Sequence, residues 1–269
     1  MSTMFDTHCH LTNEKINHSE VRAAARAAGV TGMIAVATDA ADAREAMQLA
    51  QQHQDIWFTA GVHPSEAGRT HDLDEFDALI DHPKCVAWGE MGLDGHWPDP
   101  PMDRQRPLLE AQLQRVMDAQ ALARGPRAIV LHSRKAVDEV LAVIGQTTLA
   151  GDRFVFHCFT EGPEAVERIL TSGASVSFTG VVTYRNAAEV AAASDLVPLD
   201  RLMVETDSPY LTPEPHRGTR PNTPEMVVHV AAFLAKRRGL SLADFAKATD
   251  ATAIRVYGLS IGEASASQS

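Results

Sequence analysis

Short apolar segments typical of buried strands recur eight times along this chain, and a helix-like segment follows each of them. The predicted strands are residues 4–10, 32–37, 56–62, 85–90, 128–132, 154–157, 174–178 and 202–206. The predicted helices are residues 19–28, 41–52, 73–81, 103–124, 136–144, 163–171, 187–193 and 224–238. This alternation restricts the fold to a parallel sheet whose strands are joined by right-handed crossovers.

The polar residues at the strand ends distinguish two folds that contain such a sheet. A doubly wound open sheet gathers its site at one switch point, whereas a barrel gathers side chains from the C-terminal ends of many strands. Here histidines and carboxylates close strands along the whole chain. The 269 residues are close to the roughly 250 of one barrel domain, so we predict an α/β fold, the (β/α)8 TIM barrel.

The predicted barrel domain covers residues 1–260 and includes an extra C-terminal helix. That helix is expected over residues 241–257, with Ser241 as its N-cap and Asp244 at its third position. Residues 262–269 are mostly small and polar, so we predict a disordered tail over residues 261–269.

Two histidines, His8 and His10, lie two positions apart at the end of the first predicted strand. Side chains alternate between the faces of a strand, so both imidazoles point the same way and could bind one metal ion. Cys9 then points to the opposite face, as a packed thiol rather than a ligand. Taken alone, the pair is more typical of two surface or internally hydrogen-bonded histidines.

Four further strand ends carry the same kinds of side chain, namely Glu90, His132, His157 and Asp207. A buried carboxylate or imidazole is costly unless it is paired or bound to a metal. Packing would explain one such residue, but it does not explain a whole set directed at one barrel mouth. The pattern therefore predicts a metal site.

Four histidines and two carboxylates exceed what one cation needs, which indicates two divalent cations. A carboxylate can bridge two metals, and Glu90, from the middle of the chain, is the expected bridge. A pair of cations stabilises the attacking and the leaving oxygen of a displacement reaction, and it converts water to hydroxide near neutral pH. Imidazoles suit zinc or manganese and carboxylates tolerate magnesium, so the metal identity stays open.

Several motifs occur in order from about residue 4 to residue 258. They are FDTHCHL at 5–11, GVHP at 61–64, GEMGLD at 89–94, LHSR at 131–134, HCF at 157–159, ETDSPYL at 205–211, HRG at 216–218 and PNTP at 221–224. Together they resemble the TatD deoxyribonucleases of the amidohydrolase superfamily. The resemblance implies a two-metal barrel that hydrolyses phosphodiesters, often by removing nucleotides from DNA.

The resemblance also implies a division of the ligands. One metal would be held by His8, His10, Glu90 and Asp207, and the other by Glu90, His132 and His157. Asp207, as a ligand beside the attacking water, is expected to take its proton. Three segments depart from the family pattern: GHWPDP at 95–100 replaces aromatic residues, Lys135 replaces an acidic one, and GPRA at 125–128 is unusual. The departures lie in loops that choose the substrate.

Four residues in predicted loops are candidates for substrate contact, namely His63, Arg134, Arg217 and Asn222. Arg217 and Asn222 follow the eighth strand, where barrels often bind phosphate. His63 closes the third strand and could contact a phosphate or simply be a hydrogen-bonded structural histidine. For any single arginine, an ordinary place on the surface is the simpler interpretation.

The net charge of −11 limits the ways in which the protein can bind nucleic acid. An acidic protein repels DNA at long range, although bound metals supply local positive charge. Tight coating of long duplexes is therefore disfavoured, while a nuclease stays possible.

Three cysteines are too few for a disulfide framework, and no apolar run approaches the length of a membrane span. The first residues do not resemble a secretory signal. We therefore expect a cytoplasmic protein with no membrane contact and no obligate protein partner.

Three functions remain as hypotheses. The first is hydrolysis of DNA ends or another small phosphodiester, favoured by Arg217 and Asn222. The second keeps the metals but acts on a small ester, amide or lactone, favoured by the acidic charge and the altered loop at 95–100. The third is a non-catalytic metal scaffold, which the large ligand set opposes because structural metal sites are usually closed by four ligands.

Overall fold

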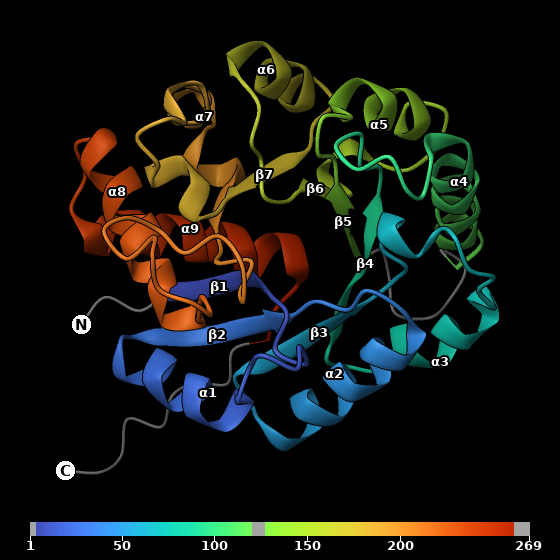
Figure 1. Ribbon diagram of the computed structural model, residues 1–269, viewed down its shortest axis with the longest axis horizontal. Helices are drawn as coiled ribbons and strands as arrows, with labels where there is room; N and C mark the ends of the chain where they lie inside the picture. Colours follow the sequence, from blue (N-terminus) through green and yellow to red (C-terminus); the bar gives the residue numbers. More distant parts are fainter. Residues whose placement is uncertain (1–3, 120–126, 261–269) are drawn as a thin grey trace.

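The computed structural model describes residues 4–119 and 127–260, and it contains eight parallel strands paired in chain order (Figure 1). They are β1 (Met4–Cys9), β2 (Val30–Ala35), β3 (Ile56–Ala60), β4 (Cys85–Gly92), β5 (Ala128–His132), β6 (Phe154–Phe156), β7 (Ser175–Phe178) and β8 (Leu202–Val204). A parallel bridge between Cys9 and Ser208 joins the end of β1 to the segment after β8. This bridge brings the first and last strands together and completes the barrel.

An outer layer of helices surrounds the strands (Figure 1). They are α1 (His18–Ala27), α2 (Ala40–Gln52), α3 (Phe76–Ile80), α4 (Met102–Ala119), α5 (Val137–Ile144), α6 (Pro163–Thr171), α7 (Ala188–Leu196), α8 (Val227–Arg237) and α9 (Leu242–Tyr257). Within the described residues, no helix is long and apolar enough to cross a membrane.

Side chains point alternately to the two faces of each strand, and this produces two apolar cores. Met33 and Ala35 of β2 belong to the core between strands and helices, whereas Ile34 belongs to a second core that also contains residues of every other strand except β7. Tyr257 of α9 packs into this second core. Strand side chains alternate in direction, so most strands contribute to both cores, whereas β7 contributes Val176 and Phe178 to the first core and has serines on its other face.

The predicted TIM barrel is confirmed, and its differences from the prediction lie at element boundaries. The predicted helix over 73–81 is split into a 3-10 turn at Leu73–Glu75 and α3. The extra C-terminal helix is present as α9, and the Ser241 side chain caps it by accepting from the Asp244 amide at 3.1 Å. Part of the predicted helix over 103–124 and the predicted tail over 261–269 lie outside the described residues.

Candidate metal centre

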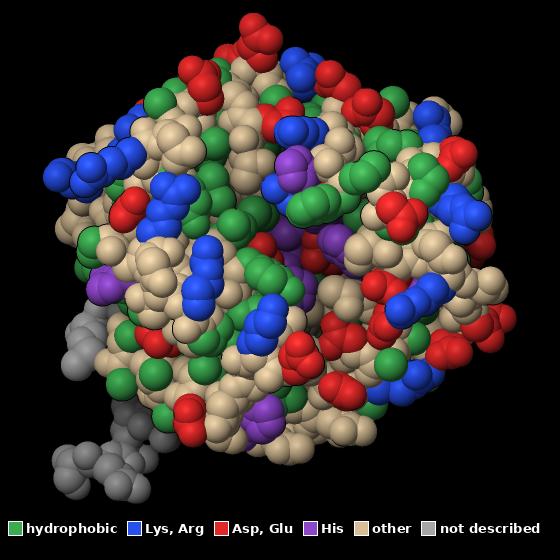
Figure 2. All heavy atoms as spheres, viewed as in Figure 1, with side chains coloured by type: hydrophobic (Ala, Val, Ile, Leu, Met, Phe, Trp, Pro, Cys, Tyr) green, Lys and Arg blue, Asp and Glu red, His purple; other side chains and the backbone are tan. Residues whose placement is uncertain are grey.

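All six predicted ligand residues lie at the C-terminal ends of the strands. They are His8 in β1, His10 after it, Glu90 in β4, His132 at the end of β5, His157 after β6 and Asp207 after β8. On this face of the molecule, histidines and carboxylates form the floor of a central hollow (Figure 2). The barrel closure therefore collects side chains that are up to about two hundred residues apart in the sequence.

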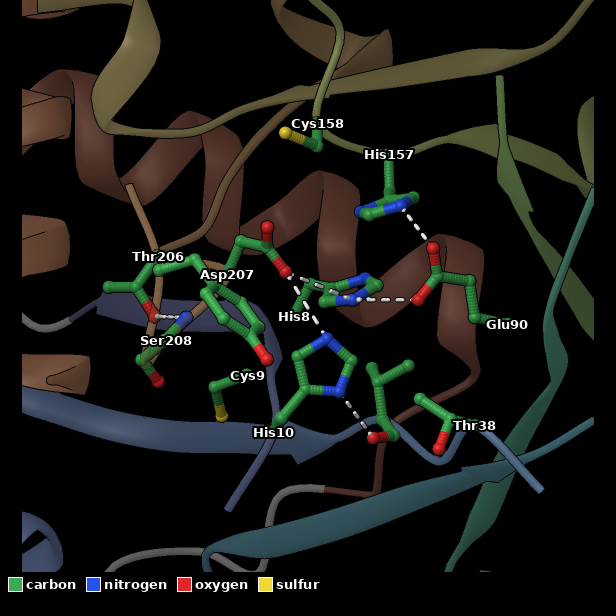
Figure 3. A network of polar contacts seen from close by, with 12 residues as sticks. His8, Cys9, His10, Thr38, Glu90, His157, Cys158, Thr206, Asp207 and Ser208 are labelled. Atoms are coloured by element: carbon green, nitrogen blue, oxygen red, sulfur yellow. Dashed lines mark hydrogen bonds and ion pairs between the residues drawn. The ribbon is translucent and has the colours of Figure 1, made fainter. Parts of the chain in front are cut away.

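Glu90 contacts more histidines of this cluster than any other carboxylate, and its contacts with His8 and His157 are drawn in Figure 3. Its Oε2 atom is 3.4 Å from His8 Nε2, and its Oε1 atom is 2.6 Å from His157 Nε2. The same Oε1 atom is 2.9 Å from His132 Nδ1 and 3.5 Å from His63 Nε2. One carboxylate thus contacts four imidazoles, and its two oxygens face different histidines.

Asp207 and His10 form the other side of the cluster. Asp207 Oδ1 is 3.3 Å from His10 Nε2 and 3.7 Å from His8 Nε2 (Figure 3). The Asp207 amide donates to the His8 carbonyl at 2.9 Å, so the backbone after β8 is tied to β1. His10 Nδ1 donates to the Val36 carbonyl at 3.0 Å, which leaves its Nε2 directed at Asp207.

Three groups of ligand atoms lie within 4.8 Å of one another in the described chain. They are His8, Glu90 and His157; His8, His10 and Asp207; and His63, Glu90 and His132. The grouping implied by the family resemblance put His157 with His132. His157 does lie beside His132, with its Nε2 atom 3.4 Å from His132 Nδ1, and its ring also stacks on His8 with 3.9 Å between ring centroids. His63 is a further neighbour of His132, with 3.3 Å between His63 Nε2 and His132 Nδ1.

The donor set fits a divalent cation. Both ring nitrogens of His8 are buried and make no hydrogen bond to the described residues. An unsatisfied buried donor or acceptor costs about 1–3 kcal/mol, and coordination would satisfy His8 Nε2. Burial, reinforced by the nearby His157, lowers the pKa of His8, which favours the neutral imidazole that metals bind.

The two carboxylates of the cluster are held in their charged form. Burial alone would raise the pKa of Glu90, but His157, His63 and His132 outweigh it and hold this pKa well below its usual range. Desolvation would raise the pKa of Asp207 as well, yet its hydrogen bond with His10 lowers this pKa. These residues therefore bring negative charge to a site that would receive a cation.

Glycines allow β4 to place Glu90 at the centre of the mouth. A Cβ atom on Gly61 would lie 2.5 Å from the Gly89 Cα atom, and Gly89 has a φ of +121° and would clash with the Val130 carbonyl oxygen if it carried a Cβ. Any larger residue at either position would separate these backbones and move Glu90.

His63, predicted as a substrate contact, lies inside the cluster. Its Nε2 atom faces Glu90 and His132, and its Nδ1 atom is 2.8 Å from the Ser65 hydroxyl. Burial lowers the pKa of His63 to about 3, so it is neutral. Its position suits metal binding at least as well as substrate contact.

The other predicted substrate contacts occupy different environments. Arg134 and Arg217 are exposed at the mouth, each over an aromatic ring. Asn222 is fully buried: its Nδ2 atom donates to the carbonyls of Thr206 at 3.0 Å and Tyr210 at 2.5 Å. Its donors are therefore committed to the backbone around Asp207, and this geometry favours a structural role over the predicted substrate contact.

Two acidic residues that the sequence analysis did not single out lie near the histidine ring nitrogens that do not face Glu90. Asp94 Oδ2 is 3.0 Å from His132 Nε2, and Glu205 Oε1 is 3.5 Å from His157 Nδ1. Glu205 also accepts from the Cys158 amide and the Ser177 hydroxyl, both at 2.6 Å. A carboxylate inside an apolar run, as in LMVE at 202–205, was the signal that could have identified Glu205.

A family model described as TatD related DNase matches residues 5–258. The chain belongs to the TatD family. It is 34% identical over 259 residues to the uncharacterized metal-dependent hydrolase YcfH of Escherichia coli strain K12, covering 94% of this chain and 95% of YcfH. It is 32% identical over 269 residues to the 3'-5' ssDNA/RNA exonuclease TatD of Citrobacter rodentium, covering 97% and 100% of the two chains.

Among solved structures, the TatD homologue YjjV of Escherichia coli K12 superposes with a TM-score of 0.86 at 28% identity, over 96% of this chain and 98% of YjjV. Fold, motifs and relatives agree, so this TatD family member is a metal-dependent hydrolase. The enzymatic hypotheses stand, and the non-catalytic scaffold does not.

Proposed function

We propose that this TatD-family hydrolase cleaves phosphodiester bonds at the ends of DNA chains, using two divalent cations held by His8, His10, Glu90, His132, His157 and Asp207. The observation that carries the proposal is the position of Glu90, whose two oxygens face different histidines within one mouth. When bound, the cations would supply Lewis-acid activation of the attacking water and of the phosphoryl group. Zinc, manganese and magnesium all suit this mixture of ligands.

The protein residues have separate tasks in this reaction. Asp207 takes the proton of the attacking water, since its carboxylate is ionised and reaches the mouth. Asp94 orients the His132 ring through its contact with Nε2, and Glu205 places its charge 3.5 Å from His157 Nδ1, so that the other ring nitrogen of each histidine faces Glu90. Arg134 and Arg217 provide positive charge at the rim of an otherwise acidic protein.

The nuclease relatives support a nucleic acid substrate over a small carboxylic ester. Metal-loaded protein incubated with end-labelled single-stranded DNA should shorten it one nucleotide at a time. A panel of small esters, amides and lactones should remain intact under the same conditions. Hydrolysis of the esters with the labelled DNA left unchanged would overturn the nuclease proposal and favour the alternative substrate class.

Glu205→Gln should weaken metal binding by about 10- to 100-fold, the usual effect of losing the carboxylate behind a metal-binding histidine. Glutamine keeps the size and one acceptor oxygen but removes the charge that faces His157. The measurement is a competition titration against a chromophoric chelator, together with thermal unfolding of the metal-free protein.

Asp250→Asn is the matched control for this prediction. Asp250 is also buried and accepts a backbone hydrogen bond, from Phe5 at 2.9 Å, but it lies on α9. It should leave metal affinity unchanged. If both variants weakened binding equally, or if Glu205→Gln only lowered stability, Glu205 would be a folding residue and not a positioning residue.

We also propose a cytoplasmic location, on chemical grounds alone. Cys9, Cys85 and Cys158 are all free thiols. Cys9 is buried and donates to the Ile34 carbonyl at 3.4 Å, as a packed thiol does. Free cysteines persist in reducing compartments.

A further inference from the structure

Three aromatic side chains at the barrel mouth each have a basic side chain close to the ring. The pairs are Arg134 over Trp97 at 5.9 Å, Arg217 over Tyr184 at 3.9 Å, and Lys15 over Tyr210 at 5.9 Å, measured to the ring centroids. All six residues lie in segments that follow the C-terminal ends of strands. They therefore border the same mouth as the metal centre.

Trp97 is the most exposed large apolar side chain of the described residues. It is 60% exposed, compared with 46% for Tyr210 and 44% for Leu196. Burying an indole is favourable, so an exposed one at a site mouth marks a binding surface. Trp97 also belongs to GHWPDP at 95–100, one of the segments in which this chain departs from the family pattern.

The Trp97 loop is attached directly to the metal centre. Asp94 Oδ1 accepts from the amides of His96 at 2.7 Å and Trp97 at 3.2 Å. The other oxygen of the same carboxylate contacts His132 Nε2 at 3.0 Å. The loop conformation and the orientation of His132 thus depend on one side chain, which fixes the indole relative to the reacting centre.

Two of these three pairs lie on opposite sides of the mouth. Trp97 and Arg134 follow β4 and β5, whereas Tyr210 and Lys15 follow β8 and β1. Because the strands are arranged around the barrel in chain order, these two positions face each other across the cluster. Hydrophobic and basic side chains are visible around the central hollow (Figure 2).

We propose that Trp97 with Arg134, and Tyr210 with Lys15, form two nucleotide subsites on opposite sides of the cleaved phosphate. In each subsite the ring stacks on an unpaired base and the basic side chain contacts an adjacent phosphate. Every base has an aromatic face, so such platforms bind single strands with little sequence preference. In a duplex those faces are already stacked, so the subsites select unpaired ends. This inference rests on the proposed nuclease function.

Tryptophan fluorescence reports on the first subsite directly. The chain has three tryptophans, and Trp57 and Trp88 are only 7% and 4% exposed, so Trp97 is the accessible one. Metal-loaded protein is titrated with a phosphorothioate-protected single-stranded hexanucleotide, with an abasic strand of the same length, and with the corresponding duplex. The hexanucleotide should quench the emission strongly, and the abasic strand and the duplex only weakly.

Binding of the labelled hexanucleotide, measured by anisotropy, tests the side chains. Trp97→Ala should raise the Kd at least about fivefold, and Trp97→Phe should restore most of the affinity, because stacking of one base contributes roughly this much. Leu196→Ala removes an exposed apolar side chain at the end of α7 and should leave the Kd unchanged.

Arg134→Ala should reduce the slope of log Kd against log salt by about 0.7, the value for one phosphate contact on a single strand. Arg237→Ala is the matched control, since Arg237 also lies over a ring, Phe233 at 5.9 Å, but at the end of α8. It changes the net charge equally and should leave the slope unchanged.

Two outcomes would overturn the inference in different ways. If Trp97→Ala bound the hexanucleotide and the abasic strand as tightly as the unaltered protein, the subsites would be wrong. The nuclease proposal would survive that result if the unaltered protein still shortened labelled DNA. If the unaltered protein neither bound nor shortened single strands, the proposed function and the subsites would fail together.

Discussion

Removal of divalent metal should lower the hydrolytic rate of this protein by at least about a thousandfold, and added zinc, manganese or magnesium should restore it. Lewis-acid activation supplies several kcal/mol of transition-state stabilisation, and each 1.36 kcal/mol is about tenfold in rate. Without a cation, water at the site lacks the Lewis acid that lowers its pKa and is a poor nucleophile near neutral pH.

The measurement is dialysis against a chelator, elemental analysis of the dialysed protein, and activity assays before and after metal is added back. Reconstitution should saturate at two equivalents per chain if Glu90 bridges two cations. Full activity at background metal content would exclude the metal mechanism. Saturation at one equivalent would retain a metal mechanism but remove the bridge.

Metal loading should also raise the temperature of unfolding. His8 is buried with no hydrogen bond from either ring nitrogen to the described residues, and a cation that binds the folded state alone stabilises it. Calorimetry with and without metal therefore provides a readout that is independent of substrate.

Asp207→Asn should lower kcat by at least about a hundredfold, the low end for loss of a general base. Asp207 has a φ of +54°, a left-handed conformation that asparagine adopts more readily than most residues, so the substitution preserves the backbone. It also keeps one oxygen near His10. The change therefore removes charge and basicity with little other disturbance.

Metal content and a pH profile separate the two roles of Asp207. The carboxylate acts as a base only when ionised, so in the unaltered protein the rate should fall as pH drops through the lowered pKa of Asp207. If Asp207→Asn keeps its metal but loses this acidic limb of the pH profile, Asp207 is the general base. If the variant loses its metal, the experiment shows only that Asp207 is a metal ligand. Full turnover would assign the base to another residue, with His63 as the first candidate.

The sequence alone determined the fold and the strand ends that carry polar side chains. Apolar runs alternating with helical patterns admit few folds, and the predicted bounds of β5 and α6 match the structure. The six candidate ligands were found because a barrel brings all C-terminal strand ends to one mouth. These conclusions depend on the hydrophobic pattern and on the order of strands and helices, and both can be read from the amino-acid sequence.

Tertiary structure alone decided which side chains touch. His63 and Asp94 lie in loops 69 and 38 residues from His132, and no local period predicts that both reach it. Asn222 was a plausible phosphate ligand until its burial showed its amide committed to two carbonyls. Alternation tells which face of a strand a residue occupies, but contacts across a mouth depend on loop paths and on the exact tilt of eight strands. Those are set by packing of the whole barrel, and so they emerge only in three dimensions.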